Sequence, residues 1–180
     1  MNETAVNNDQ LERAKKIKLL LLDVDGILTD GKLYFSNSGD EIKAFNILDG
    51  HGIKMLQESG VKVGIVTGRE SDLVAKRALD LGITIVVQGS KNKGATVDEI
   101  RSQQSLNWEQ VAFMGDDYPD LSAMVRCGLA LTVSNGHRAV AARAHWQSKN
   151  NGGDGAVREA CDMILQAQGS YEAALDKYLR

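Results

Sequence analysis

Two aspartates, Asp23 and Asp25, are the first side chains in this 180-residue sequence that could do chemistry together. They stand in "IKLLLLDVDG", directly after an unbroken apolar run. A single Asp-x-Asp pair is usually a turn or a helix cap, so the pair alone indicates little. The leucines before it predict a strand that is buried on both faces. Such a strand would hold both carboxylates at a fixed place.

Polar groups also follow three other apolar runs of the sequence. These groups are Thr67 and Gly68, then Lys93, and then Asp116 and Asp117. If the runs are parallel strands, their carboxyl ends meet at one edge of a sheet, where ligands bind in such folds. The sequence therefore predicts one site that combines several carboxylates, a hydroxyl group and an amine.

Phosphoryl transfer is the chemistry that this combination favours. Carboxylates placed close together repel one another unless a hard cation such as Mg²⁺ lies between them. A lysine and a threonine hydroxyl suit the phosphate oxygens that Mg²⁺ also binds. One carboxylate can act as a nucleophile, and a second can protonate the leaving oxygen. Lys93 lies in "SKNKG", so Lys91 is a rival for the role of the amine.

The remainder of the chain alternates between strand and helix patterns, which predicts an α/β fold with a doubly wound, Rossmann-like parallel sheet. We expect a small β-hairpin insertion at residues 32–47 and no large cap domain. The expected strands are residues 17–22, 61–68, 83–89, 109–117 and 129–136. The expected helices are residues 52–59, 71–82, 93–104, 119–128, 137–145 and 155–169.

Composition limits the classes of function. The formal net charge of −3 argues against a general nucleic-acid surface, and the apolar runs are too short to cross a membrane. Residues 1–16 form a polar extension without the apolar core of a signal peptide, so we expect a cytoplasmic protein. We expect one phosphatase domain over residues 17–169 and a tail over residues 170–180.

Four short motifs resemble the signature motifs of the haloacid dehalogenase superfamily of phosphatases. They are "DVDG", "VTGR", a later lysine and "GDDYPD", in that order. The resemblance implies that Asp23 is the nucleophile and Asp25 the general acid and base. It further implies that Thr67, the Gly68 amide and Lys93 hold the phosphoryl group.

The same resemblance implies a magnesium site. Asp23 and Asp116 would bind Mg²⁺ through their side chains, and Asp25 through its backbone carbonyl. Asp117 or Asp120 would support the metal. Asp120 follows Pro119, and a place at the helix N-terminus would explain it equally well.

A finer similarity, over residues 17–169, is to the 3-deoxy-D-manno-octulosonate 8-phosphate phosphatase family, whose product is used for bacterial lipopolysaccharide. It implies a homotetramer in which hairpins form a central barrel. Asn46, Ile47, Leu48, Asp49, Gly50, Lys54, Arg69 and Arg77 match its substrate-contacting positions. Leu48 departs from the family, which commonly has arginine in this segment.

The residues themselves also favour an oligomer. Between Asp25 and Thr67 there is room for a hairpin and one helix, but not for a large cap. Phosphoryl transfer benefits from the exclusion of water, so the substrate or a neighbouring subunit must cover the site. The segments "KLYF" and "IKAFNI" could supply the apolar contact.

Three other functions remain to be weighed. A phosphatase of a nonulosonate 9-phosphate would use the same chemistry, and Leu48 keeps it open. A receiver-like signalling module also holds a phospho-aspartate at strand ends, but it needs no acid such as Asp25. An inactive structural homologue is disfavoured because every expected catalytic position is filled.

Overall fold

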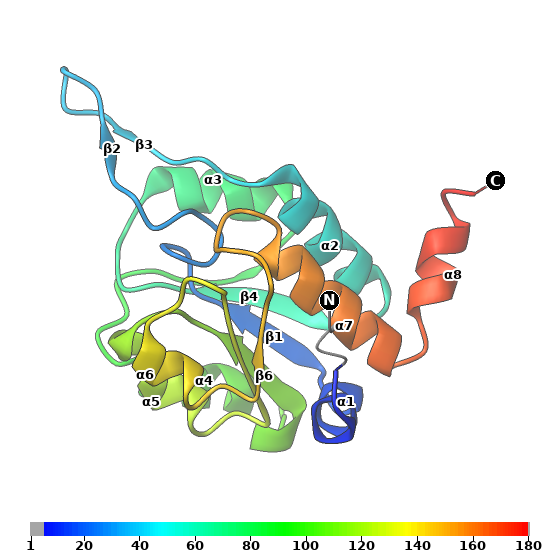
Figure 1. The fold of residues 1–180 in the computed structure, drawn as a ribbon. Coiled ribbons are helices and arrows are strands. Elements are labelled where there is room, and N and C mark those ends of the chain that lie inside the picture. The colour runs from blue at the N-terminus through cyan, green and yellow to red at the C-terminus, as the bar shows by residue number, and fades with distance from the viewer. Residues whose placement is uncertain (1–5, 180) are drawn as a thin grey trace.

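A six-stranded parallel sheet forms the centre of the protein in our computed structural model, which describes residues 6–179. The strands lie in the order β5-β4-β1-β6-β7-β8 (Figure 1). Their bounds are β1 Leu19–Leu22, β4 Lys62–Val66, β5 Ile85–Val87, β6 Val111–Met114, β7 Leu129–Thr132 and β8 Trp146–Gln147. The predicted doubly wound α/β fold is confirmed.

The leucine run forms β1, which pairs in parallel with β4 on one side and β6 on the other. All four leucines are fully buried. Leu20 and Leu22 belong to the core on one face of the sheet, and Leu19 and Leu21 belong to the core on the other face. Because β1 is packed on both faces and paired on both edges, the residues that follow it have a fixed starting point.

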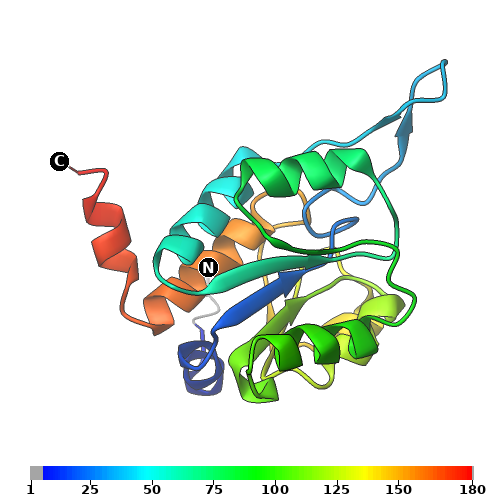
Figure 2. The same cartoon turned by 180° about the vertical axis from the view of Figure 1, so that it is seen from behind.

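Helices cover both faces of the sheet (Figures 1 and 2). One layer consists of α1 Asn8–Lys15, α2 Ile47–Glu58, α3 Asp72–Asp80 and α7 Ala156–Ala167, with α8 Tyr171–Asp176 packed against α7. The other consists of α4 Lys93–Gln103, α5 Leu121–Met124 and α6 Arg138–Ala141. No helix among residues 6–179 is long and apolar enough to cross a membrane.

The predicted hairpin is present as β2 (Tyr34–Phe35) and β3 (Glu41–Ile42). It projects from the body of the protein, with its tip far from the sheet (Figure 1). Its turn includes Gly39, whose φ of +90° favours glycine. Between Asp25 and the start of β4 at Lys62, the described chain contains only this hairpin and α2, as expected for a protein without a large cap.

Several elements differ from the sequence prediction. The helix α2 begins at Ile47 rather than at Gly52, because the Asn46 side chain caps it by accepting the Leu48 N–H at 2.7 Å. Pro119 lies in a 3-10 turn, Tyr118–Asp120, that precedes a short α5. Within the expected polar extension, α1 forms behind a capping box between Asn7 and Gln10.

Candidate active site

Asp23 and Asp25 leave the end of β1 in a tight turn. The Asp23 N–H donates to the Met114 carbonyl at 3.0 Å, which continues the sheet one residue beyond the strand. Gly26 then takes a φ of +90°, and a Cβ atom there would lie 2.2 Å from the Asp116 carboxylate. Gly26 thus lets the carboxylate of Asp116, from the end of β6, approach the first strand.

Asp120 organises the loop that carries Asp116. Its Oδ2 accepts the N–H groups of Asp116 and Asp117 at 3.0 and 3.2 Å, and its side chain is 1% exposed. Asp117 is exposed, and its carboxylate accepts the Tyr118 N–H at 2.8 Å. Asp120 therefore both fixes the loop and turns a buried charge towards Asp23.

Lys93 is the cation at the centre of this group. Its Nζ lies 2.8 Å from Asp23 Oδ1 and 2.5 Å from Asp120 Oδ1, and its side chain is 4% exposed. Burial lowers the pKa of Lys93, but the charges of Asp23 and Asp120 outweigh burial and raise it overall. The ammonium form is thus favoured. Lys91, the rival in the sequence, is exposed.

The carboxylates fit a hard divalent cation. One oxygen from each of Asp23, Asp116 and Asp120 lies within 4.8 Å of the others. Burial, and then the charge of Asp120, raises the pKa of Asp23 to about 6. Burial, and then the charges of Asp120 and Asp23, raises the pKa of Asp116 to about 7. Three carboxylates facing one lysine carry excess negative charge, which a bound Mg²⁺ would offset.

The Asp25 carboxylate lies apart from this cluster. Lys43 donates a hydrogen bond to Asp25 Oδ1, and Arg69 lies 3.7 Å from Asp25 Oδ2. Glu41 lies near both cations, at 3.4 Å from Lys43 and 2.7 Å from Arg69. Sequence reasoning missed Lys43 and Glu41, because they belong to a hairpin predicted for its apolar residues.

Thr67 and Gly68 directly follow β4, and they precede Arg69. Thr67 is 2% exposed, and its carbonyl accepts the Ser90 N–H at 3.0 Å. Its hydroxyl lies 3.4 Å from the Arg69 N–H. Gly68 is exposed, and a Cβ atom there would meet only the Ser90 carbonyl, at 3.6 Å. The strand end therefore leaves the Gly68 backbone open to a ligand.

The eight expected substrate positions are not gathered at one point. Ile47, Gly50, Lys54 and Arg77 line a hollow of about 210 Å³ between α2 and α3, together with His51 and Leu81. None of the cluster carboxylates lines this hollow. Arg77 donates to the Asn46 carbonyl at 3.2 Å and packs over the Phe45 ring. Leu48 is exposed at the start of α2.

Asp49 points away from solvent, towards the start of α7. It is 1% exposed, and its Oδ1 accepts the Arg158 N–H at 2.8 Å. Its Oδ2 is buried without a hydrogen-bond partner, and burial raises the pKa of this carboxyl group. In this arrangement Asp49 links α2 to α7.

The glycine-rich segment before α7 packs against the turn that contains Asp25 and Gly26 in the same chain. A Cβ atom at Gly152 would lie 1.7 Å from the Gly26 carbonyl, and the Gly153 N–H donates to the Ile27 carbonyl at 2.9 Å. Asn46 adds a contact to the Gly153 carbonyl at 3.3 Å. This backbone contact joins the glycine-rich segment to the turn that follows Asp25.

Two larger hollows lie elsewhere, with volumes of about 620 and 700 Å³. The first is lined by residues at the amino ends of β1 and β4, and the second by α1, α7 and the segment around β8. Neither includes a residue of the carboxylate cluster. We place the active site by its chemistry rather than by the size of the hollow.

Comparison with known proteins shows the family of the chain. Residues 80–159 match the family of haloacid dehalogenase-like hydrolases. The 3-deoxy-D-manno-octulosonate 8-phosphate phosphatase KdsC of Yersinia pestis is 43% identical over 169 residues, which cover 94% of this chain and 90% of that protein. The KdsC protein of Escherichia coli K12 is 42% identical over the same shares.

Solved structures agree with the sequence relatives. A probable YrbI family phosphatase of Pseudomonas syringae is 48% identical, with a TM-score of 0.95 over 97% of this chain and 99% of that one. The 3-deoxy-D-manno-octulosonate 8-phosphate phosphatase of Moraxella catarrhalis, solved with magnesium, phosphate and KDO, is 38% identical. Its TM-score is 0.93 over 95% of this chain and 98% of that one. The chain therefore belongs to the 3-deoxy-D-manno-octulosonate 8-phosphate phosphatase family of haloacid dehalogenase-like hydrolases.

Proposed function

We propose that this protein is a Mg²⁺-dependent phosphatase that converts 3-deoxy-D-manno-octulosonate 8-phosphate to the free sugar acid and phosphate. The observation that carries the proposal is the cluster of Asp23 after β1, Asp116 after β6 and Lys93 at the start of α4. Relatives that are 42–43% identical over 94% of the chain bear the name of this activity.

The proposed reaction has two halves. In the first, the Asp23 carboxylate attacks phosphorus and forms an aspartyl phosphate, and Asp25 gives a proton to the departing sugar oxygen. In the second, Asp25 takes a proton from water, which attacks the phosphorus and releases phosphate and Asp23. The position of Asp23 fits the role of nucleophile, because the buried strand β1 holds it rigidly.

The neighbours of Asp23 have distinct proposed roles. Thr67, the Gly68 N–H and Lys93 hold the phosphoryl oxygens. Asp23, Asp116 and the backbone carbonyl of Asp25 bind Mg²⁺, and the structure supports Asp120 over Asp117 as their helper, since Asp120 is buried in the cluster. Bound Mg²⁺ supplies positive charge that offsets the negative charge of the phosphoryl group.

Recognition of the sugar acid requires cations beyond Lys93. Arg69 is the best supported of these, because it lies beside Asp25 and is partly exposed. Lys54 and Arg77, with Asn46, Ile47, Leu48, Asp49 and Gly50, are the remaining proposed substrate positions. Those that line the hollow between α2 and α3 could reach substrate only at some distance from the carboxylate cluster.

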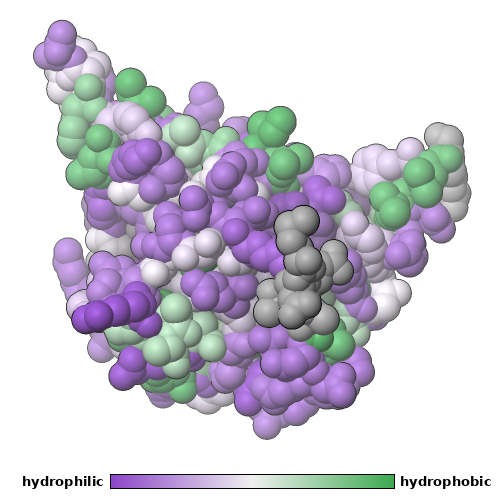
Figure 3. All heavy atoms as spheres, viewed as in Figure 1, coloured by the Kyte–Doolittle hydropathy of each residue, from purple (hydrophilic) through white to green (hydrophobic). Residues whose placement is uncertain are grey.

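We further propose a cytoplasmic homotetramer that serves lipopolysaccharide synthesis. Support for an oligomer comes from the hairpin, where Leu33, Tyr34, Phe35 and Ile42 are all exposed (Figure 3). A reducing compartment agrees with the two buried free cysteines, Cys127 and Cys161. The pathway follows from the proposed product.

The test is Mg²⁺-dependent phosphate release from a panel of substrates, with Asp23→Asn as the blank. The panel contains the octulosonate 8-phosphate, a nonulosonate 9-phosphate, neutral sugar phosphates and an aryl phosphate. We expect the octulosonate to have the highest kcat/KM. Preference for the nonulosonate would keep the mechanism and overturn the substrate. Stable retention of phosphate on Asp23 without release would overturn the phosphatase and favour a signalling module.

A further inference from the structure

A buried lysine joins the exposed hairpin to the proposed acid–base residue. Leu33, Phe35 and Ile42 of the hairpin face solvent, but the Lys43 side chain, one residue beyond β3, is only 3% exposed. A buried lysine requires charged or polar partners, because an unpaired ammonium is costly to desolvate. The partners of Lys43 are the carboxylates of Asp25 and Glu41.

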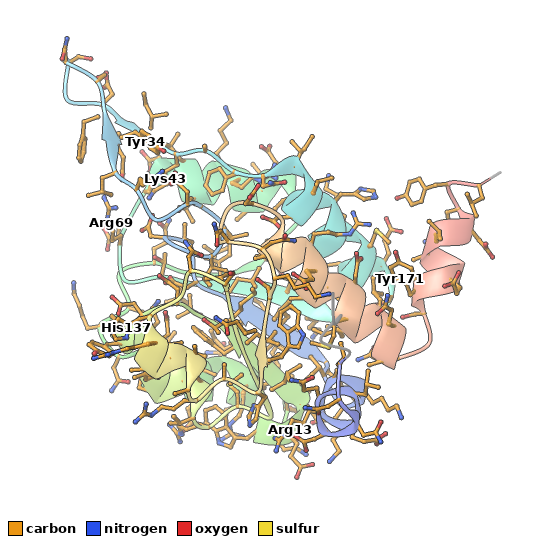
Figure 4. All side chains as sticks on the ribbon, in the orientation of Figure 1. Arg13, Tyr34, Lys43, Arg69, His137 and Tyr171 are labelled. Atoms are coloured by element: carbon orange, nitrogen blue, oxygen red, sulfur yellow. The ribbon has the colours of Figure 1, made fainter. Side chains whose placement is uncertain are left out.

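Both oxygens of the Asp25 carboxylate have a cation beside them. Lys43 contacts Oδ1, and Arg69 lies 3.7 Å from Oδ2. Glu41 bridges the two cations from β3, at 3.4 Å from Lys43 and 2.7 Å from Arg69. Lys43 and Arg69 lie together at the base of the hairpin in Figure 4. The rotation of the Asp25 carboxylate is therefore restrained from two elements that are distant in sequence.

The two restraints differ in strength. The Arg69 side chain is 44% exposed, and its guanidinium lies 3.7 Å from Asp25 Oδ2, which is longer than a hydrogen bond. Solvent therefore weakens this ion pair. Lys43 is enclosed and contacts Asp25 directly. A carboxyl group that must deliver its proton to a leaving oxygen has to hold its orientation, since a small misplacement costs up to about 10²-fold in rate.

We propose that Lys43 is a positioning residue for the first half of the reaction: its ammonium orients the Asp25 carboxylate towards the leaving sugar oxygen. This proposal rests on the acid–base role given to Asp25 above. It also makes the hairpin part of the catalytic apparatus, because Glu41 and Lys43 belong to its returning strand and the residue beyond it.

The choice of leaving group separates positioning from other roles. A sugar alkoxide is strongly basic and needs the acid, whereas a nitrophenolate leaves without help. The ratio kcat/KM reports steps up to formation of the aspartyl phosphate and omits its hydrolysis. We expect Lys43→Met to lower kcat/KM for the octulosonate phosphate by about 10- to 100-fold, and for p-nitrophenyl phosphate by less than about 3-fold. Lys43→Arg should recover part of the loss.

The matched control is Lys32→Met on the same hairpin, where the side chain is 72% exposed and pairs with Asp30 at 3.6 Å. It should leave both substrates unaffected. Thermal unfolding of every variant checks the fold. If Lys43→Met does not fold, Glu41→Gln removes one partner of Lys43 and should give a smaller loss that is again selective for the sugar phosphate.

A double-mutant cycle with Asp25→Asn, measured in single turnovers, decides the mechanism. If Lys43 acts through Asp25, Lys43→Met causes no further loss in the Asp25→Asn background. Additive losses would overturn the proposal and indicate that Lys43 contacts the sugar directly. Equal losses on both substrates would overturn it as well. If Asp25→Asn alone keeps full activity on the sugar phosphate, the acid–base assignment itself is wrong, which is a separate result.

Discussion

At the scale of single residues, the candidate active site holds several negative charges close together, which lowers the stability of the metal-free fold. The pKa of Asp116 is raised to about 7 by burial and then by Asp120 and Asp23, and that of Asp23 to about 6. An unfolded aspartate has a pKa of about 3.9. Between about pH 4 and 7 the metal-free folded state thus binds more protons than the unfolded state, and this contribution makes stability fall as pH rises.

Because stability falls as pH rises, we can predict the effect of Asp116→Asn on stability in the absence of metal. At pH 8 the variant should unfold at a higher temperature than the wild type, because one repelling charge is gone. Asp116 is partly exposed, so we expect a modest gain of about 1 kcal/mol, or ~2–4 °C. At pH 5 the gain should vanish. Thermal unfolding in EDTA at the two pH values measures it. Asp80→Asn, at an exposed position, is the control. An equal rise in unfolding temperature at both pH values, or the same rise in Asp80→Asn, would contradict charge repulsion at Asp116 as the cause.

Lys93 should matter for stability as well as for chemistry. Its ammonium is the shared partner of Asp23 and Asp120, and Lys93 and Asp120 are both almost fully buried. Lys93→Met should cost about 3 kcal/mol in the free energy of unfolding, because a buried charge loses its partner. Adding Asp120→Asn should recover part of the cost. Urea unfolding measures both variants, and exposed Lys91→Met is the control. Similar values for the two lysine variants would refute the assignment.

At the scale of elements, the sequence predicted what depends on short-range patterns. The run of leucines fixed β1, and polar residues at the ends of apolar runs marked the strand ends. Short-range patterns could not predict the contacts that orient the site, because the residues in contact are far apart in the sequence. Asp25 and Lys43 are 18 residues apart, and Asp49 and Arg158 are 109 residues apart. Partners of that kind depend on how helices and hairpin pack. The two-residue edge strand β8 and the helix α8 were also too short to leave a pattern.

The link between α2 and α7 yields a prediction at this scale. Asp49→Ala should remove the acceptor for the Arg158 N–H at the start of α7 and destabilise the protein by about 1 kcal/mol. Asp49→Asn keeps an acceptor oxygen and should cost less. Urea unfolding compares the variants, and amide exchange at Arg158 reports the local change. Unaltered exchange at Arg158 in Asp49→Ala would mean that this hydrogen bond does not hold the start of α7.

At the scale of the whole molecule, the exposed apolar residues are unevenly placed. The hairpin presents a projecting set of four (Figure 3), while elsewhere exposed apolar residues occur singly or as the pairs Ile47–Leu48 and Tyr178–Leu179. A two-stranded ribbon is only marginally stable in water when it stands alone. Exposed apolar patches of this kind mark interaction sites. Contact between hairpins would both stabilise the ribbon and bring a neighbouring subunit near a site that has no large cap.

The pair Phe35→Glu and Ile42→Glu, which places charges on the hairpin, should therefore break the assembly. Size-exclusion chromatography with light scattering should show the wild type at a multiple of 19.5 kDa and the double variant near 19.5 kDa. Val125→Glu is the control, because Val125 is as exposed as Phe35 but lies beyond α5. Activity on the sugar phosphate should fall with the loss of assembly, because water then reaches the leaving oxygen. A wild type that is already monomeric would overturn the proposed homotetramer, and a double variant that keeps its assembly would show that the hairpin does not hold the assembly together.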